Sequence, residues 1–257
     1  MIEKDLIDCY SDKKWTKEVE ELFPITEHGC INYGYWEQVP KKISLETREK
    51  SQLALYREVF KFAEIQQEKS ILEVGCGRGH GVFLLSQMKC DPCGIDISDS
   101  QIVKCKSSYP GLNFQVGNAE NMNFRDHSFD YVVSIEAAQH FSNFARFCLE
   151  AKRVLRENGR LIVSTFFFQS PNAKERIHNY LPGDVSGYHH FIDIENGRSY
   201  MKAAGFRKVK QKSIGEKVFR GFSRWAKQEM SCLNHTTNWV LAYEAGLIDY
   251  YMLKAEF

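Results

Sequence analysis

Short apolar runs recur along the middle of the chain, and each is followed by a segment whose apolar residues recur at helical spacing. Runs of this kind occupy residues 70–74, 93–98, 112–116, 128–135 and 160–166. Before the last of them a helix is predicted from Phe144 to Arg156, with Gly159 in its C-terminal cap. Strands of a parallel sheet are buried on both faces and are therefore apolar along their length, while helices return the chain between them. With two later strand patterns, at 206–213 and 247–257, this order predicts an α/β protein with a doubly wound sheet of about seven strands.

The segment before the first strand, residues 1–68, predicts mostly helices, with a long one around residues 53–62. Residues 28–36 interrupt this pattern, because glycine and asparagine are interleaved there with large aromatic side chains. This composition suits a loop that folds flat rings over a ligand, and it suits equally well an aromatic plug that seals the core.

Two stretches near the end of the chain, at about 167–194 and 216–246, are predicted cap insertions. The first follows the fifth strand and is punctuated by proline and glycine, and the second carries an aromatic helix. Long irregular stretches after a core strand generally carry function. The chain is therefore divided into a lid segment, residues 1–68, and a main domain, residues 69–257, that includes both caps.

A cluster of glycines follows the first predicted strand. Glu73 lies in that strand, and Gly75, Gly77, Gly79 and Gly81 come after it, just before an apolar helix pattern. A strand, a tight glycine turn and a helix form the arrangement by which α/β sheets hold a nucleotide-like ligand. The glycine spacing fits neither the dinucleotide fingerprint nor the phosphate-binding P-loop. In every possible register, at least one position lacks the residue that the motif requires.

Composition narrows the class of protein further. The chain has 257 residues, 43% of them hydrophobic and 26% charged, with a formal net charge of +1, which gives no electrostatic case for nucleic acid. Neither a signal peptide nor a membrane span is expected. Eight scattered cysteines predict reduced thiols in a cytoplasmic protein, and Cys90 and Cys93 are interpreted as ordinary cysteines around a turn.

The motif from Glu73 to Gly79, acidic-x-Gly-x-Gly-x-Gly, resembles the class I S-adenosylmethionine (SAM)-dependent methyltransferases of the small-molecule type. The resemblance covers residues 70–165 firmly and the rest loosely. It implies a Rossmann-like fold with a final antiparallel strand, SAM as cofactor and S-adenosylhomocysteine (SAH) as product. It also implies that Glu73 and the glycine loop hold the methionine end of SAM.

Polar residues at the ends of the later strands complete the predicted cofactor site. Asp96 ends the second strand, where a carboxylate can accept both ribose hydroxyl groups, and Asn118 stands where the family commonly has an aspartate beside adenine. The predicted cofactor-binding residues are Tyr33, Glu73, Gly75, Cys76, Gly77, Gly79, Asp96, Ile97, Asn118, Ala119, Glu120 and Glu136.

His140, just beyond the fourth strand, is the candidate general base, because imidazole titrates near neutral pH. Glu136 is a second candidate catalytic residue, which could orient His140, contact a substrate cation or bind the backbone. A Gly-Tyr-Trp segment, residues 34–36, is similar to the lid of phosphoethanolamine and tocopherol or sterol methyltransferases. The predicted substrate-binding residues are Tyr35, Trp36, His140, Phe166, His189, His190 and Phe222.

No metal site is predicted, because adjacent histidines such as His189 and His190 point to different faces of an extended chain. The predicted function is methyl transfer from SAM to a small hydrophobic or aromatic acceptor, with O-methylation as first choice. N-methylation of a small amine and C-methylation of a sterol- or quinone-like ring remain open alternatives, as do an RNA or protein methyltransferase and a catalytically silent SAM-binding scaffold. The sequence predicts no oligomeric state.

Overall fold

The computed structural model describes residues 29–180, 190–229 and 234–257. His189 and the short helices expected near the start of the chain lie outside the described residues. Within the part of the chain that is described, no helix is long and apolar enough to cross a membrane.

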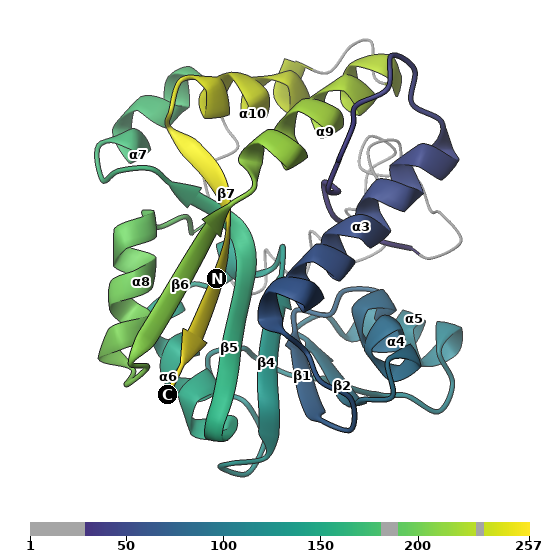
Figure 1. The fold of residues 1–257 in the computed structure, drawn as a ribbon, viewed down its shortest axis with the longest axis vertical. Coiled ribbons are helices and arrows are strands. Elements are labelled where there is room, and N and C mark those ends of the chain that lie inside the picture. The colour runs from purple at the N-terminus through teal and green to yellow at the C-terminus, as the bar shows by residue number, and fades with distance from the viewer. Residues whose placement is uncertain (1–28, 181–189, 230–233) are drawn as a thin grey trace.

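A seven-stranded sheet forms the centre of the molecule (Figure 1), with the strand order β3-β2-β1-β4-β5-β7-β6. Its strands are β1 (Ser70–Val74), β2 (Asp91–Asp96), β3 (Asn113–Val116), β4 (Phe129–Ile135), β5 (Leu155–Phe168), β6 (Lys208–Ser213) and β7 (Ile248–Glu256). The first five strands pair in parallel, and β7 lies antiparallel between β5 and β6. The predicted doubly wound sheet with a final antiparallel strand is therefore confirmed.

Helices cover both faces of this sheet. Those that connect successive strands include α4 (His80–Gln87), α5 (Asp99–Ser108), α6 (Phe144–Val154) and α8 (Ile194–Ala203). Helices α4 and α5 contact β1, β2 and β3, whereas α6 contacts β5 and α8. The apolar face of each helix buries against the sheet, as expected for crossover helices of a parallel sheet.

The remaining helices are α3 (Leu45–Ala63), α7 (Ala173–Arg176), α9 (Gly215–Glu229) and α10 (Asn234–Glu244). Figure 1 shows α7, α9 and α10 together beyond the end of the sheet where β5 finishes, with α3 running diagonally beside them. Parallel strands have their carboxyl ends on this side, so these helices lie where α/β folds bind ligands.

Strand β4 shows why the apolar runs are continuous. Val133 packs in the cluster that includes α3, and its neighbour Val132 packs in the cluster that includes α6. Successive side chains of a strand point to opposite faces, and both faces of this strand are covered. Alternation of polar and apolar residues is therefore absent from the sequence of β4.

One predicted boundary is wrong. The sequence predicts a helix from Phe144 to Arg156 that ends at a Gly159 cap, but α6 ends at Val154. Leu155 is already extended, fully buried and paired with Phe129 as the first residue of β5. A Cβ atom on Gly159 would lie 2.9 Å from the Arg156 carbonyl oxygen and 3.1 Å from the Asp130 carbonyl oxygen, so this glycine permits both a tight bend at the start of β5 and the close approach of β4.

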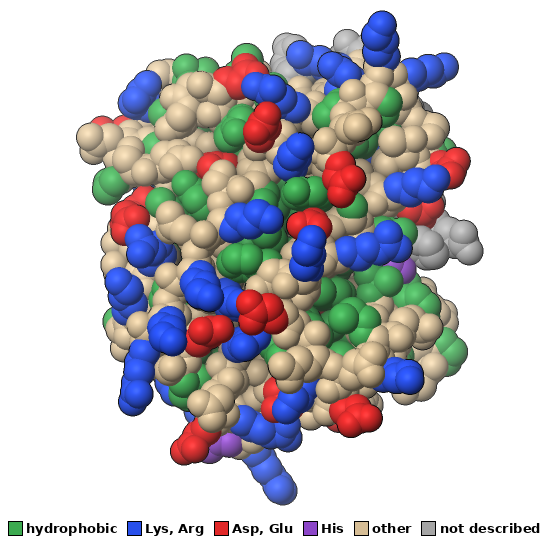
Figure 2. Space-filling view, in the orientation of Figure 1, with side chains coloured by type: hydrophobic (Ala, Val, Ile, Leu, Met, Phe, Trp, Pro, Cys, Tyr) green, Lys and Arg blue, Asp and Glu red, His purple; other side chains and the backbone are tan. Residues whose placement is uncertain are grey.

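Lys and Arg side chains are interspersed with Asp and Glu over the face shown in Figure 2. Lys208, Lys210 and Lys212 are exposed along β6, which is the last strand of the sheet. Lysines on an edge strand discourage pairing with another chain, and this protection of the sheet edge explains the three lysines on β6.

Candidate functional site

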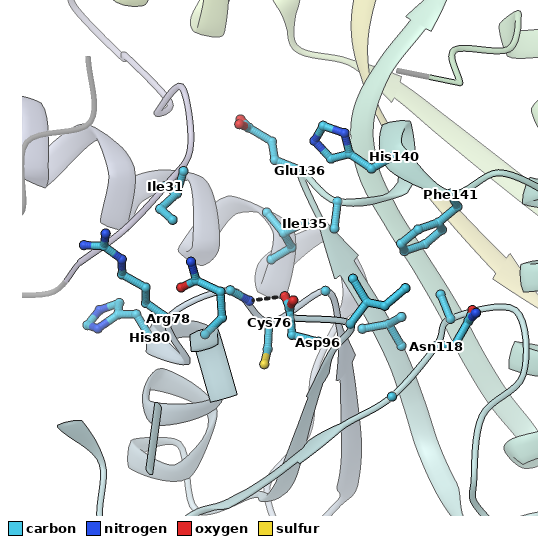
Figure 3. Close-up of a pocket in the computed structure, with 18 of the residues that line it drawn as sticks. Ile31, Cys76, Arg78, His80, Asp96, Asn118, Ile135, Glu136, His140 and Phe141 are labelled. Atoms are coloured by element: carbon cyan, nitrogen blue, oxygen red, sulfur yellow. Dashed lines mark hydrogen bonds between the residues drawn. The ribbon is translucent and has the colours of Figure 1, made fainter. Parts of the chain in front are cut away.

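A pocket of about 500 Å³ opens at the carboxyl ends of β1, β2, β3 and β4. This volume falls within the range of small-molecule binding sites. Ten of the predicted site residues line it: Gly75, Cys76, Gly77, Asp96, Ile97, Asn118, Ala119, Glu120, Glu136 and His140. Figure 3 shows Asp96 at the floor of this pocket, with Glu136 and His140 side by side at one end.

The glycine loop forms the floor, and its two leading glycines are needed for different reasons. Gly75 has φ +74°, and a Cβ atom there would lie 2.3 Å from the Ala137 Cβ atom. Gly77 has φ +52°, but a Cβ atom there would meet no heavy atom within 4 Å. Both positions favour glycine because φ is positive, and Gly75 must also be glycine because no space remains for a side chain.

Asp96 fixes the loop to the end of β2. Its Oδ2 atom accepts a hydrogen bond from the Gly77 N–H group and its Oδ1 atom accepts one from the Ser98 N–H group, each at 2.9 Å. Burial raises the pKa of this carboxyl group to about 6, and the backbone N–H groups oppose the shift. Each carboxylate oxygen has further lone-pair capacity, so Asp96 can accept hydroxyl groups from a ligand in the pocket.

The opposite wall comes from the loop after β3. The Asn118 Oδ1 atom accepts a hydrogen bond from the Glu120 N–H group at 2.7 Å, which fixes the side-chain amide. The Glu120 carboxylate accepts hydrogen bonds from the Ser142 hydroxyl group and the Asn143 N–H group, both at 2.8 Å. These bonds join the segments that follow β3 and β4, so the wall is held by polar contacts across the pocket.

Glu136 ends β4 in a left-handed backbone conformation, with φ +48°. Its N–H group donates to the Ser164 carbonyl, and its carboxylate accepts from the Tyr33 N–H group at 3.0 and 3.1 Å. Burial raises the pKa of Glu136 to about 8, while the Tyr33 N–H group and the charge of Arg48 act in the opposite direction. Non-glycine residues adopt this conformation uncommonly, and these hydrogen bonds hold Glu136 in it.

His140 closes a single turn of 3₁₀ helix, Ala138–His140, directly after Glu136. The backbone N–H group of His140 donates to the Ala137 carbonyl. The turn is anchored because the side-chain oxygen of Gln139 accepts a hydrogen bond from the Thr165 hydroxyl group. In Figure 3 the His140 ring lies on the pocket wall between Glu136 and Phe141. The backbone of His140 is therefore fixed, and its imidazole ring faces the pocket.

Glu73 and Gly79 lie beneath the pocket and do not line it. The Glu73 side chain is only 2% exposed, accepts a backbone hydrogen bond from Val82, and has its pKa raised to about 8 by burial. A Cβ atom on Gly81 would lie 2.2 Å from the Glu73 Oε1 atom, so carboxylate and loop are in close contact. The contact of Glu73 with the methionine end of a cofactor stays a prediction.

The pocket is not lined by the aromatic residues predicted to bind the substrate, Tyr35, Trp36, Phe166 and Phe222, or by Tyr33, which was predicted to bind the cofactor. The Tyr33 ring stacks on Phe222 at a centroid distance of 3.7 Å, and it meets Phe166 edge to face at 4.9 Å. Trp36 is buried with Phe222 and Trp225. Tyr35 packs against the core cluster that includes α3. These rings pack on one another and on the core, as an aromatic plug would, and their contact with a ligand stays a prediction.

The histidine pair gives no metal centre among the residues with described positions, where no group of three or more His, Cys, Asp or Glu could hold a metal ion. The His190 N–H group donates to the Gln139 carbonyl at 2.7 Å, which ties the cap to the turn that carries His140. His190 does not line the pocket.

Several pocket residues were not predicted from the sequence. They include Gly29, Cys30, Ile31, Tyr56, Arg78, Gln101 and Phe141. Arg78 lies within the glycine loop itself, and Cys30 and Ile31 belong to the irregular segment at 28–36, so position alone could have suggested them. Gln101 is a buried polar residue of α5, and a polar side chain in a helix gives no such signal.

A family model described as a methyltransferase domain matches residues 72–163. The phthiotriol/phenolphthiotriol dimycocerosates methyltransferase of Mycobacterium tuberculosis is 31% identical over 198 residues, which are 74% of this chain and 65% of that protein. The fatty-acid O-methyltransferase of Mycolicibacterium smegmatis is 27% identical over 201 residues, covering 76% of this chain and 65% of that protein.

The fold is shared with a solved structure of geranyl diphosphate C-methyltransferase from Streptomyces coelicolor A3(2), in complex with Mg²⁺, geranyl-S-thiolodiphosphate and SAH. The TM-score is 0.81 at 12% sequence identity, and the alignment covers 99% of this chain and 97% of that one. The chain therefore spans about two thirds of the length of its sequence relatives and nearly all of this structural relative.

Proposed function

Because the chain belongs to the class I SAM-dependent methyltransferase family, we propose that it transfers a methyl group from SAM to a small apolar acceptor. The observation that carries this proposal is the pocket itself, in which the Asp96 carboxylate and the open glycine loop lie at one end and His140 at the other. A cofactor site and a candidate base therefore share one enclosed space.

The residues present fit the cofactor. Asp96 would accept the ribose hydroxyl groups, and the Asn118 amide, fixed by the Glu120 N–H group, would meet the adenine ring. The absence of a side chain at Gly77 leaves room above the loop for the methionine end. When bound, SAM supplies a sulfonium-activated methyl group, so the protein need only align the acceptor, exclude water and remove a proton.

O-methylation is the reaction we propose first, with His140 accepting the proton of an acceptor hydroxyl group. The fixed backbone of the Ala138–His140 turn supports this role, because a base must be held in place to be effective. N-methylation and C-methylation stay as alternatives, since an amine also needs its proton removed and a ring carbon needs a base at a later step.

We propose a lipid-like acceptor. Ile31, Ile135 and Phe141 give the pocket apolar side chains. The names of two sequence relatives point in the same direction, because one acts on dimycocerosate lipids and the other on fatty acids. An apolar pocket with a few polar groups suits an acceptor that is mostly apolar and carries one hydroxyl group.

Calorimetric titration of the protein with SAM, SAH and NAD is the first test. Micromolar binding of SAM and SAH without binding of NAD is expected, and absence of SAM binding would contradict the proposal. Incubation with labelled SAM and matched sets of hydroxylated lipids, small amines and sterol- or quinone-like rings then separates the three reactions. Labelled product from the amines or rings alone would replace O-methylation, and SAM binding without any product would favour the scaffold.

A further inference from the structure

Arg48 is a charged side chain that the cofactor site described above does not include. It belongs to the first turn of α3, and its side chain is completely buried. The Arg48 guanidinium group donates to the carbonyl oxygens of Asn32 and Tyr33, and more weakly to the Ser51 hydroxyl group at 3.4 Å. Burial lowers the pKa of Arg48 to about 10, so the group keeps its charge at neutral pH.

The peptide unit between Asn32 and Tyr33 joins Arg48 to Glu136. Its carbonyl oxygen accepts from Arg48, and its N–H group donates to both carboxylate oxygens of Glu136. A cation at the oxygen end and an anion at the hydrogen end both match the dipole of a peptide group, so the two charges stabilise each other through it. A buried guanidinium group needs such compensation, because an unpaired buried charge is costly.

The backbone around this peptide leaves little freedom to move. Gly34 has φ +82°, and a Cβ atom there would lie 2.3 Å from the Ser51 Oγ atom and 2.9 Å from the Arg48 Nη1 atom. Gln52, one turn along α3, donates from its Nε2 atom to the Cys30 carbonyl at 2.7 Å. Cys30 lines the pocket, so α3 holds one pocket wall through two buried side chains, of which only Arg48 is charged.

We infer that Arg48 is a positioning residue: through the Asn32–Tyr33 peptide it fixes the pocket wall and favours the ionised form of Glu136. Glu136 is one of the residues that line the pocket, and a negative charge of low solvent exposure there favours a cation. SAM carries a sulfonium charge and SAH does not. The inference rests on the proposed cofactor, and it assigns to Arg48 and Glu136 the discrimination between the cofactor and its product.

Other titratable groups also face Glu136 and must be separated from it. Tyr250 of β7 contacts the carboxylate, and Tyr56 of α3 lies within electrostatic range. His140 lies beside Glu136 in Figure 3 and would repel a cationic ligand when protonated. The test therefore includes Glu136→Gln, which removes only the contribution of this carboxylate.

The experiment measures dissociation constants of SAM and SAH by calorimetry between pH 6.5 and 9.5 for the full chain. In the unsubstituted protein the preference for SAM over SAH should rise with pH, with a midpoint near the Glu136 pKa of about 8. Arg48→Gln removes the charge and keeps a donor, and it should raise this midpoint by at least about one pH unit. At pH 8 that shift lowers the ionised fraction of Glu136, and with it the preference for SAM, about fivefold. Glu136→Gln should abolish the pH dependence.

Gln52→Met is the matched control, because it removes hydrogen bonds to the same wall without changing a charge. It should weaken SAM and SAH by the same factor and leave the midpoint unchanged. If Arg48→Gln also weakens both ligands equally at every pH, Arg48 is only structural and the inference is wrong, while the proposed function stands. Failure of the unsubstituted protein to bind either ligand would instead contradict the proposed function.

Arg48→Gln could prevent folding, which circular dichroism would reveal. In that event the double variant Arg48→Gln/Glu136→Gln decides the matter, because it removes both charges at once. Recovery of the folded spectrum would support the pairing of the two charges, and continued failure would contradict it.

Discussion

The carboxylate of Asp96 accepts a hydrogen bond from the Gly77 N–H group, and this bond ties the end of β2 to the loop that follows β1. Asp96 therefore has two tasks, since it shapes the glycine loop and offers its remaining lone pairs to a ligand. A substitution at this position should affect ligand affinity through both routes.

Asp96→Ala should lower the affinity for SAM at least tenfold, which corresponds to about 1.4 kcal/mol of binding free energy. The physical reason is the loss of both ribose hydrogen bonds, with added disorder of Gly77. Calorimetry with SAM measures the effect. Asp91→Ala is the control, because Asp91 is an exposed carboxylate at the start of the same strand. Equal affinity of Asp96→Ala and the unsubstituted protein would refute the assignment.

His140→Ala should spare SAM binding and lower turnover by roughly a hundredfold or more, because the proposed base is lost while the cofactor wall stays intact. Turnover numbers and SAM dissociation constants measured on one preparation separate the two effects. His178→Ala provides a control, since His178 is exposed and does not line the pocket. Normal turnover of His140→Ala would mean that alignment alone supports the reaction.

Three glycines with positive φ, of which Gly75 and Gly77 belong to the glycine loop and Gly111 does not, permit a comparison of substitutions. Gly111 has φ +90° and open space around its Cβ position, so Gly111→Ala measures the cost of positive φ alone, about 1–2 kcal/mol. Gly77→Ala should cost similar stability and also lower SAM affinity, because its Cβ atom enters the pocket. Gly75→Ala should cost more stability than either, because its Cβ atom would overlap with Ala137. Thermal unfolding and SAM titration of the three variants check this order, and equal melting temperatures would contradict it.

The sequence was sufficient for the sheet and for most of the cofactor pocket, because both depend on local patterns. Strand β4 is apolar on both faces. Asp96 is the last residue of β2 and Glu136 directly follows β4, and the carboxyl ends of these strands must meet. The end of α6 was misplaced, because Gly159 matches a helix cap in sequence although it serves the approach of two strands.

Contacts between distant segments could not be predicted in this way. Arg48 and Gln52 look like ordinary polar residues of a helix, and their burial depends on a backbone segment about 20 residues away. The rings of Tyr33 and Phe222 are 189 positions apart, and whether they face a ligand or each other is decided only by the packing of α9. Residue type therefore identified the aromatic residues of the lid and cap segments, but not the direction in which their rings point.

Glu73 gives a prediction about stability and pH. Its folded-state pKa is raised to about 8 by burial, whereas an unfolded glutamate titrates near 4.3. Between these values the folded protein binds more protons than the unfolded chain, so the contribution of Glu73 to the free energy of unfolding falls as pH rises, and it levels off above pH 8. Below pH 4.3 both states are protonated and the contribution is constant.

Glu73→Gln should remove this dependence, because the amide is neutral at every pH and keeps an oxygen to accept from Val82. The variant should gain at least about 1 kcal/mol over the unsubstituted protein at pH 9, or about 2–4 °C in melting temperature, and little or nothing at pH 5. Thermal unfolding at both pH values measures the difference, with the exposed Glu157→Gln as control for the loss of one carboxylate. Equal shifts at pH 5 and pH 9 would show that Glu73 does not change its protonation on unfolding, and a loss of stability at pH 9 would show that a charged Glu73 is required by the glycine loop.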